Sequence, residues 1–123
     1  NFGSVPHPAS RKVADAVKLM QTDRPDLLVD GEMHVDVALD RALGSRLHPQ
    51  SRIQGDANVL VFPDLASGNI GYKLVQYLGG AEAIGPMLVG MAKPVVVSYQ
   101  AASVQTLVNL TTVALAGLGR TNA

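Results

Sequence analysis

Four side chains that can bind protons or metals alternate along one short segment. DGEMHVD carries one at every second position: Asp30, Glu32, His34 and Asp36. In an extended backbone all four would point to the same side, and carboxylates with an imidazole suit a divalent ion. Alternatively the segment turns into a helix midway, which scatters the four groups and leaves the carboxylates to cap turns or pair with lysines. We expect the second arrangement, and therefore no metal site.

A small polar turn, Ser67-Gly68-Asn69, lies between an apolar run and a helix-like stretch. In α/β folds ligands bind at the carboxyl ends of strands, beside helix N-termini whose free amides attract anions. The turn has neither the lysine of a P-loop nor a complete G-x-G-x-x-G pattern. Two interpretations stay open: contact with a phosphate or nucleotide, or a plain connection between two elements.

Other polar side chains also stand near predicted turns. Ser4 offers a hydroxyl beside a glycine, but no Ser/His/Asp arrangement follows from its spacing. His7 and His48 lie beside prolines, where we expect solvated rather than catalytic imidazoles. Tyr99 and Gln100 end a predicted strand just before a capped helix, which is a cleft position in an α/β fold, or else an ordinary loop.

The overall composition limits the class of protein. The 123 residues are 47% hydrophobic, which suits one domain or part of one. Ten basic and ten acidic residues leave no net charge to attract nucleic acid or an anionic membrane. The chain has no cysteine, no signal-peptide pattern and no apolar stretch near the roughly 20 residues of a membrane span. We expect a cytoplasmic protein and, because the sequence starts without methionine, a piece of a longer one.

Helix-like and strand-like segments alternate along the chain. Periodicity predicts a helix over residues 9–21, ending before Arg24, and another from about Val35. Short apolar runs predict strands at residues 26–30 and 57–62, the second buried on both faces, with an exposed connection over residues 44–56.

The second half continues this alternation. A core-facing helix over residues 68–78, with Asp64 or Ser67 as N-cap, should end at Gly79-Gly80. Two short strands follow within residues 83–91 and 93–98. Ser103 should cap a last helix with one apolar face: Val104, Leu107, Val108, Thr111 and Leu115. The alternation predicts an α/β layered sheet with some parallel pairing.

Several segments carry a family resemblance: NFGS, PDLLVDGEMHVDVAL, ANVLVFPDLASGNIGYKLVQYLGGAEAIGP and GMAKPV. Together they resemble the carboxyl-terminal part of the phosphate acetyltransferase and butyryltransferase family. The resemblance implies that residues 1–123 are a partial three-layer α/β/α domain, like those of isocitrate and isopropylmalate dehydrogenases. It also implies a dimer in which coenzyme A and phosphate meet in a cleft between two lobes.

This chain departs from the active members of that family. After the strand at KPV they carry Asn-Asp-Leu-Ser-Arg-Gly-Cys-Ser and then an aspartate, and the preceding helix carries an arginine. By resemblance, the serine and arginine correspond to Tyr99 and Gln100, the cysteine to Ala102, the aspartate to Thr106 and the helix arginine to Tyr77. Tyrosine and glutamine cannot replace the permanent charge and forked donors of arginine. We therefore expect no catalytic residue in this chain.

A second resemblance accounts for these losses. NFGS, GEMH and ASV, with VN further on, resemble the transacetylase-like domain of large bacterial NADP-dependent malic enzymes. This resemblance implies that the domain serves as a regulatory module, which senses acetyl-CoA and supports oligomerisation. NADP and a divalent metal would then belong to a catalytic domain upstream, with no cofactor in this chain.

These observations lead to one expectation and two alternatives. We expect an acetyl-CoA-responsive, non-catalytic domain of a homo-oligomeric malic enzyme that converts malate to pyruvate and CO2. The first alternative is an active acyltransferase acting between coenzyme A and phosphate, and the second is a purely structural dimerisation segment. The candidate residues for the acyl-CoA and phosphate cleft are Ser4, Asn69, Tyr77, Ser98, Tyr99, Gln100 and Thr106.

Overall fold

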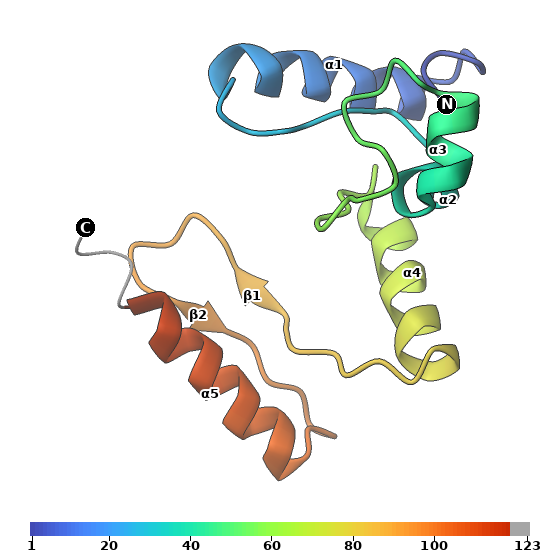
Figure 1. The fold of residues 1–123 in the computed structure, drawn as a ribbon. Coiled ribbons are helices and arrows are strands. Elements are labelled where there is room, and N and C mark those ends of the chain that lie inside the picture. The colour runs from blue at the N-terminus through green and yellow to red at the C-terminus, as the bar shows by residue number, and fades with distance from the viewer. Residues whose placement is uncertain (119–123) are drawn as a thin grey trace. The chain divides into compact units, whose positions relative to one another are not determined.

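The computed structural model describes residues 1–118 and divides into two compact units, Asn1–Gly71 and Tyr72–Ala123. The structure is mostly helical with one small sheet (Figure 1). Its elements are α1 (Pro8–Asp23), α2 (Val35–Leu39), α3 (Arg41–Leu47), α4 (Leu65–Leu78), β1 (Met87–Leu88), β2 (Val95–Val96) and α5 (Val104–Leu118). No helix within residues 1–118 is long and apolar enough to cross a membrane.

Helix α1 forms as the periodicity predicts. His7 caps it, because its Nδ1 accepts a hydrogen bond of 3.2 Å from the amide of Ala9, and Pro8 occupies the first helical position. The helix ends at Asp23, just before Arg24, as predicted. Val17 is its buried side chain and belongs to the core of the first unit.

Helices α2 and α3 meet at a single residue, Asp40. Its backbone ends α2, while its carboxylate accepts a hydrogen bond of 2.9 Å from the amide of Leu43 and so caps α3. Val37 and Ala38 of α2 are buried. Gly55 lies against this junction with φ of +75°, and a Cβ there would overlap the backbone of Arg41. Glycine is therefore required at this close approach.

Three predictions for the first unit are wrong. Residues 26–30 and 57–62 are not strands, and both runs remain largely exposed, with Val61 at 86%. A strand needs a ladder of hydrogen bonds to a neighbouring strand, and no strand within residues 1–118 pairs with either run. The predicted exposed connection over residues 44–56 is interrupted by α3 and contains the buried residues Gly44 and Ser51.

Helix α4 is longer than predicted and begins at Leu65, so Ser67-Gly68-Asn69 lies inside it rather than in a turn. The predicted end at Gly79-Gly80 is confirmed, since the helix stops at Leu78 and Gly80 has φ of +65°. The expected core-facing row is wrong because Ile70, Leu74 and Leu78 are all more than half exposed. In the first unit the ring of Phe62 packs instead on Gly68 and Gly71, where a Cβ would come within 3.7 and 2.9 Å of that ring.

The two predicted strands of the second unit form an antiparallel pair. Met87 lies opposite Val96 and Leu88 opposite Val95. The predicted parallel pairing is wrong for these strands, because parallel neighbours need a crossover of about a dozen residues or more and this connection is shorter. No further sheet is formed by residues 1–118, so the three-layer architecture stays a prediction.

Helix α5 packs on this hairpin with the side opposite to the predicted one. Its N-cap is Ser103, as predicted, because the Ser103 Oγ accepts a hydrogen bond of 3.0 Å from the amide of Thr106. Leu110 is 2% exposed, and Gly117 lies against Pro94 at the start of β2. Figure 1 shows α5 running beside β2. The predicted face, which includes Leu107 and Val108, points outward and lines a shallow hollow of about 300 Å³.

Candidate functional site

The predicted cleft residues are divided between the two units. Ser4 and Asn69 belong to the first unit, and the other five belong to the second: Tyr77, Ser98, Tyr99, Gln100 and Thr106. Asn69 is an exposed residue of α4.

Ser4 lies in an N-terminal segment that is bound to residues 31–34. Its hydroxyl accepts a hydrogen bond of 2.9 Å from the terminal amino group of Asn1. The carboxylate of Glu32 accepts a hydrogen bond of 2.5 Å from the amide of Gly3, and the backbone carbonyl of Glu32 accepts one from Phe2. The two sequence segments NFGS and GEMH are therefore structural partners, and Ser4 has no histidine in hydrogen-bond contact among the described residues.

The alternating acidic residues of DGEMHVD do not converge. Asp30 accepts hydrogen bonds from the Ser51 hydroxyl at 2.9 Å and from the Arg52 amide at 2.7 Å. Asp36 accepts a hydrogen bond from the amide of Val37 in the first turn of α2. No three His, Asp or Glu side chains gather as a metal site within residues 1–118. The segment turns into a helix at Val35, as the helical alternative predicts, but only Asp36 acts locally, because Asp30 and Glu32 bond residues distant in the sequence.

The start of α4 does not offer free amides to an anion. The Asp64 carboxylate accepts a hydrogen bond of 2.7 Å from the amide of Ser67, so Asp64 rather than Ser67 is the cap. This amide, then the Ser67 side chain and the charge of Lys12, hold the pKa of Asp64 below its usual value. A negative charge already occupies the place where a phosphate would bind, so the connection interpretation of this glycine-rich stretch is favoured.

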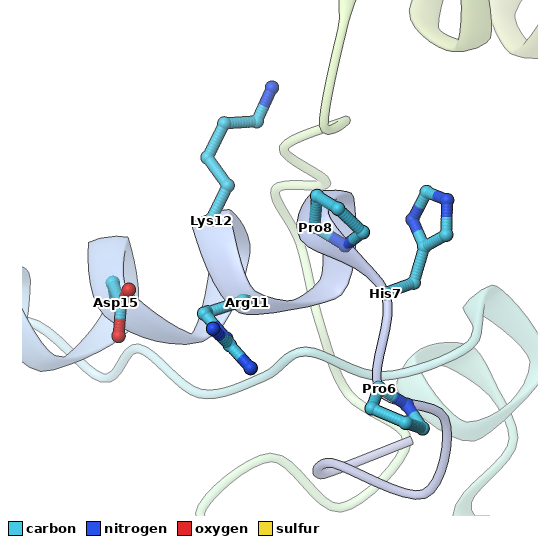
Figure 2. A pocket seen from close by; sticks show the side chains of 6 residues that line it. All are labelled: Pro6, His7, Pro8, Arg11, Lys12 and Asp15. Atoms are coloured by element: carbon cyan, nitrogen blue, oxygen red, sulfur yellow. The ribbon is translucent and has the colours of Figure 1, made fainter.

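A hollow of about 500 Å³ lies at the start of α1. Figure 2 shows its lining residues: Pro6, His7, Pro8, Arg11, Lys12 and Asp15. The Lys12 and Arg11 side chains leave the helix in different directions, and the His7 ring points away from both (Figure 2). The Lys12 ammonium donates a hydrogen bond to the carbonyl of Pro63. These basic groups do not converge on one ligand position.

In the second unit, a lysine lies among tyrosines. The Lys73 ammonium is 4.8 Å from the centroid of the Tyr72 ring and 5.9 Å from that of the Tyr77 ring. Hydrogen bonding to the Tyr72 hydroxyl, with the charge interactions of Tyr72, Tyr77 and Tyr99, raises the pKa of Lys73. Tyr77, which the sequence predicts as a cleft residue, thus lies within cation–π distance of Lys73.

The remaining predicted residues of the second unit stand at or before the start of α5. The Thr106 hydroxyl lies 2.9 Å from the Ser103 hydroxyl, so Thr106 belongs to the helix cap. The carbonyl of Tyr99 accepts a hydrogen bond from the amide of Ala102, which closes the turn that precedes α5. Ser98 and Gln100 are exposed.

Few groups in the second unit can carry charge or protons. Residues 72–118 contain no Arg, His, Asp or Cys, and their charged residues are Lys73, Lys93 and Glu82. The Glu82 carboxylate accepts a hydrogen bond from the side-chain amide of Asn109. This part of the chain therefore supplies no arginine clamp and no free carboxylate or imidazole base.

A family model described as phosphate acetyl/butaryl transferase matches residues 1–115. The chain belongs to this family. The phosphate acetyltransferase of Paracoccus denitrificans is 48% identical over 90% of the chain and 35% of its own length. The NADP-dependent malic enzyme of Escherichia coli (strain K12) is 40% identical over 94% of the chain and 15% of its own length. Sequences similar to this chain thus occur both in a phosphate acetyltransferase and in a malic enzyme.

A solved structure agrees with the family assignment. The EutD phosphotransacetylase of Staphylococcus aureus matches 93% of the chain with a TM-score of 0.86 and 39% identity. The match covers 36% of that protein, so the chain spans about a third of the length of the phosphate acetyltransferases it resembles. The described fold is therefore that of a partial phosphate acetyl/butyryl transferase domain.

Lys73 is the residue that sequence reasoning missed. It stands in GNIGYKLVQY, a segment noted for its glycines rather than for its cation. The available signal was scarcity: it is one of only two lysines, with no arginine, in residues 72–118. A basic residue is conspicuous in this almost uncharged part of the chain.

Proposed function

We propose that this chain is the carboxyl-terminal part of a phosphate acetyltransferase-like domain. The domain binds acetyl-CoA and regulates the activity of its parent protein, and it does not itself catalyse acyl transfer. The observation that carries the proposal is that residues 72–118 contain no Arg, His, Asp or Cys. The family resemblance places a serine, arginines and an aspartate in this part of the chain. Acyl transfer between coenzyme A and phosphate needs cationic groups for two anions and a base near the thiol. Tyr77, Tyr99 and Gln100 supply neither.

The parent protein in this proposal is an NADP-dependent malic enzyme. This choice is supported by a relative of that name, which is 40% identical to this chain and aligns with 94% of it. NADP and a divalent metal would bind in an upstream catalytic domain. The protein would be a cytoplasmic homo-oligomer in which acetyl-CoA binds two quaternary arrangements unequally and so shifts their populations.

An active phosphate acetyltransferase is the second candidate. It is favoured by the 48% identity to phosphate acetyltransferases, including the one from Bacillus subtilis over 76% of the chain. In that case a lobe outside this chain would contribute the missing anion-binding groups. Both candidates share acyl-CoA as ligand and differ in the parent enzyme and in whether an acyl group moves.

One experiment separates the two candidates. The full-length protein is assayed for acetyl phosphate formation from acetyl-CoA and phosphate, and for malate oxidation with NADP in the presence and absence of acetyl-CoA. No acetyl phosphate, together with malate oxidation that responds to acetyl-CoA, is the expected result. Rapid acetyl phosphate formation would overturn the regulatory proposal and establish the acyltransferase.

A further inference from the structure

Helix α1 begins with an uncommon cap. His7 occupies the N-cap position, where serine, threonine, aspartate and asparagine are strongly preferred. Its Nδ1 accepts a hydrogen bond of 3.2 Å from the amide of Ala9, one of the amides that have no partner within the helix. None of the four preferred caps changes its charge near neutral pH, whereas an imidazole does so between about pH 5 and 8. The start of α1 therefore depends on a group that can gain a proton.

The hydrogen bond to Ala9 requires a neutral imidazole. Nδ1 accepts it only while its lone pair is free, so the ring hydrogen of neutral His7 is on Nε2. A proton on Nδ1 turns the acceptor into a donor and leaves the amide without this bond. It also places a positive charge at the end of the helix where the dipole is already positive. Protonation of His7 therefore opens the first turn of α1.

The charged groups near His7 do not compensate for this proton. Helix α1 has no acidic residue in its first turn. The hollow beside His7 is bordered by three charged side chains of the same helix, Arg11, Lys12 and Asp15 (Figure 2). The one carboxylate among them, that of Asp15, lies 3.6 Å from the Lys18 ammonium, and His7 forms no ion pair within residues 1–118. No acidic group is thus placed to hold a proton on this imidazole.

The beginning of α1 is also tied to the beginning of α4. The Lys12 ammonium donates a hydrogen bond to the carbonyl of Pro63, which directly precedes the Asp64 cap. Opening of α1 as far as Lys12 removes the support for this bond. Asp64 itself stays ionised in mild acid, because its pKa is held below its usual value. A proton on His7 is therefore transmitted to α4 through Lys12.

We infer that His7 makes the first unit sensitive to pH. At about pH 7.5 the neutral ring fixes the first turn of α1 and, through Lys12, the start of α4. At about pH 5.5 the protonated ring releases both. The inference goes beyond the proposed function, because it concerns the first unit alone and requires neither a ligand nor acyl transfer.

Hydrogen exchange in the full-length protein tests this inference. Protection of the backbone amides of residues 9–12 is measured at about pH 7.5 and about pH 5.5 and corrected for the intrinsic effect of pH on exchange. It should fall about fivefold in acid, which is the size expected for the loss of an N-cap. Equal protection at the two pH values would overturn the inference.

Variants of the histidines assign the response. His7→Asp supplies a cap that stays ionised in this range, so residues 9–12 should remain protected at both pH values. His34→Ser is the matched control, because His34 is the N-cap residue of α2 but its side chain forms no cap hydrogen bond, and this variant should keep the full response. A response that persists in His7→Asp, or that disappears in His34→Ser, would overturn the inference.

A lysine variant tests the transmission to α4. In the parent protein, protection of residues 65–68 should also fall in acid. Lys12→Met removes the hydrogen bond to Pro63, so residues 65–68 should lose their response while residues 9–12 keep theirs. An unchanged response of residues 65–68 in Lys12→Met would overturn the transmission through this lysine.

Discussion

The Lys73 ammonium lies 4.8 Å from the centroid of the Tyr72 ring, in a unit whose one acidic residue over residues 72–118 is bonded elsewhere. A cation over an aromatic face is stabilised by the negative face of the ring. This contact orients Lys73 without neutralising it.

Restoring the family residues should restore acyl-transfer chemistry. Replacing Tyr99→Ser, Gln100→Arg, Thr106→Asp and Tyr77→Arg together returns the serine, both cations and the acidic group that the family resemblance places at these positions. We expect acetyl phosphate formation to rise from background to a measurable rate in the full-length protein. Tyr99→Ser alone is the control and should stay at background, because it restores no charge. A parent protein already active in this assay would contradict the prediction.

The Asp64 cap should make stability depend on pH. Because the pKa of Asp64 is lowered on folding, its contribution is present above the unfolded value near 4 and is lost as pH falls through the folded value. Asp64→Ala should lower the melting temperature by a few degrees at neutral pH. Asp64→Asn keeps a capping oxygen and should lose less. A melting temperature with the same acid dependence in Asp64→Ala and in the parent would contradict this assignment.

The two sides of α5 should respond differently to truncation. Leu110 is 2% exposed, so Leu110→Ala should reduce the free energy of unfolding by about 2–5 kcal/mol. Leu107, on the outward side, is 45% exposed, and Leu107→Ala should change it by about 0.5 kcal/mol or less. Urea unfolding of the two variants measures the difference. A larger loss for Leu107→Ala would mean that the side predicted from the sequence is the buried one.

Gly55 should be the least replaceable glycine of the first unit. Gly55→Ala combines a positive φ with overlap against the backbone of Arg41 and should lose about 3 kcal/mol or more. Gly3→Ala has a similar φ of +79° but open space around it, and should lose only about 1 kcal/mol. The pair separates backbone strain from steric overlap. Similar losses in denaturant titrations would show that overlap contributes nothing.

Asp30 should act as a structural acceptor rather than a metal ligand. Asp30→Ala leaves the Ser51 hydroxyl and the Arg52 amide unpaired and should lower the free energy of unfolding by about 1–3 kcal/mol. Asp30→Asn retains one acceptor oxygen and should lose less. The losses should be the same with and without a chelator. Destabilisation of the parent by the chelator, absent in Asp30→Ala, would instead indicate a bound metal.

Local signals in the sequence predicted local structure well. Helix α1, the end of α4 at Gly79-Gly80 and the Ser103 cap depend on residues within one helical turn of each other. The runs at residues 26–30 and 57–62 were mispredicted as strands because strand formation depends on a partner elsewhere. Helix α5 was assigned the wrong side because apolar residues occupy both sides, as Leu107 and Leu110 illustrate. Periodicity alone does not choose between them.

The candidate site was predicted in part. Resemblance gave the positions Tyr77 and Tyr99. Tyr77 follows Lys73 by four residues on α4, so the helix predicted over residues 68–78 already places the two side chains on one face. Thr106 was a candidate by correspondence and proves to be part of a helix cap. That role follows from the hydroxyl of Ser103 three residues earlier and is a purely local effect.

The ring of Phe62 lies on the α4 backbone at Gly68 and Gly71. A Cβ at residue 71 would come within 2.9 Å of the ring, whereas a Cβ at residue 68 would make an ordinary contact of 3.7 Å. The contact therefore demands glycine at residue 71 and tolerates alanine at residue 68. A descendant that had lost every ligand would still need the glycine at residue 71. Among homologous sequences, invariance at that position then reports the seat of an aromatic ring and is no record of phosphate binding.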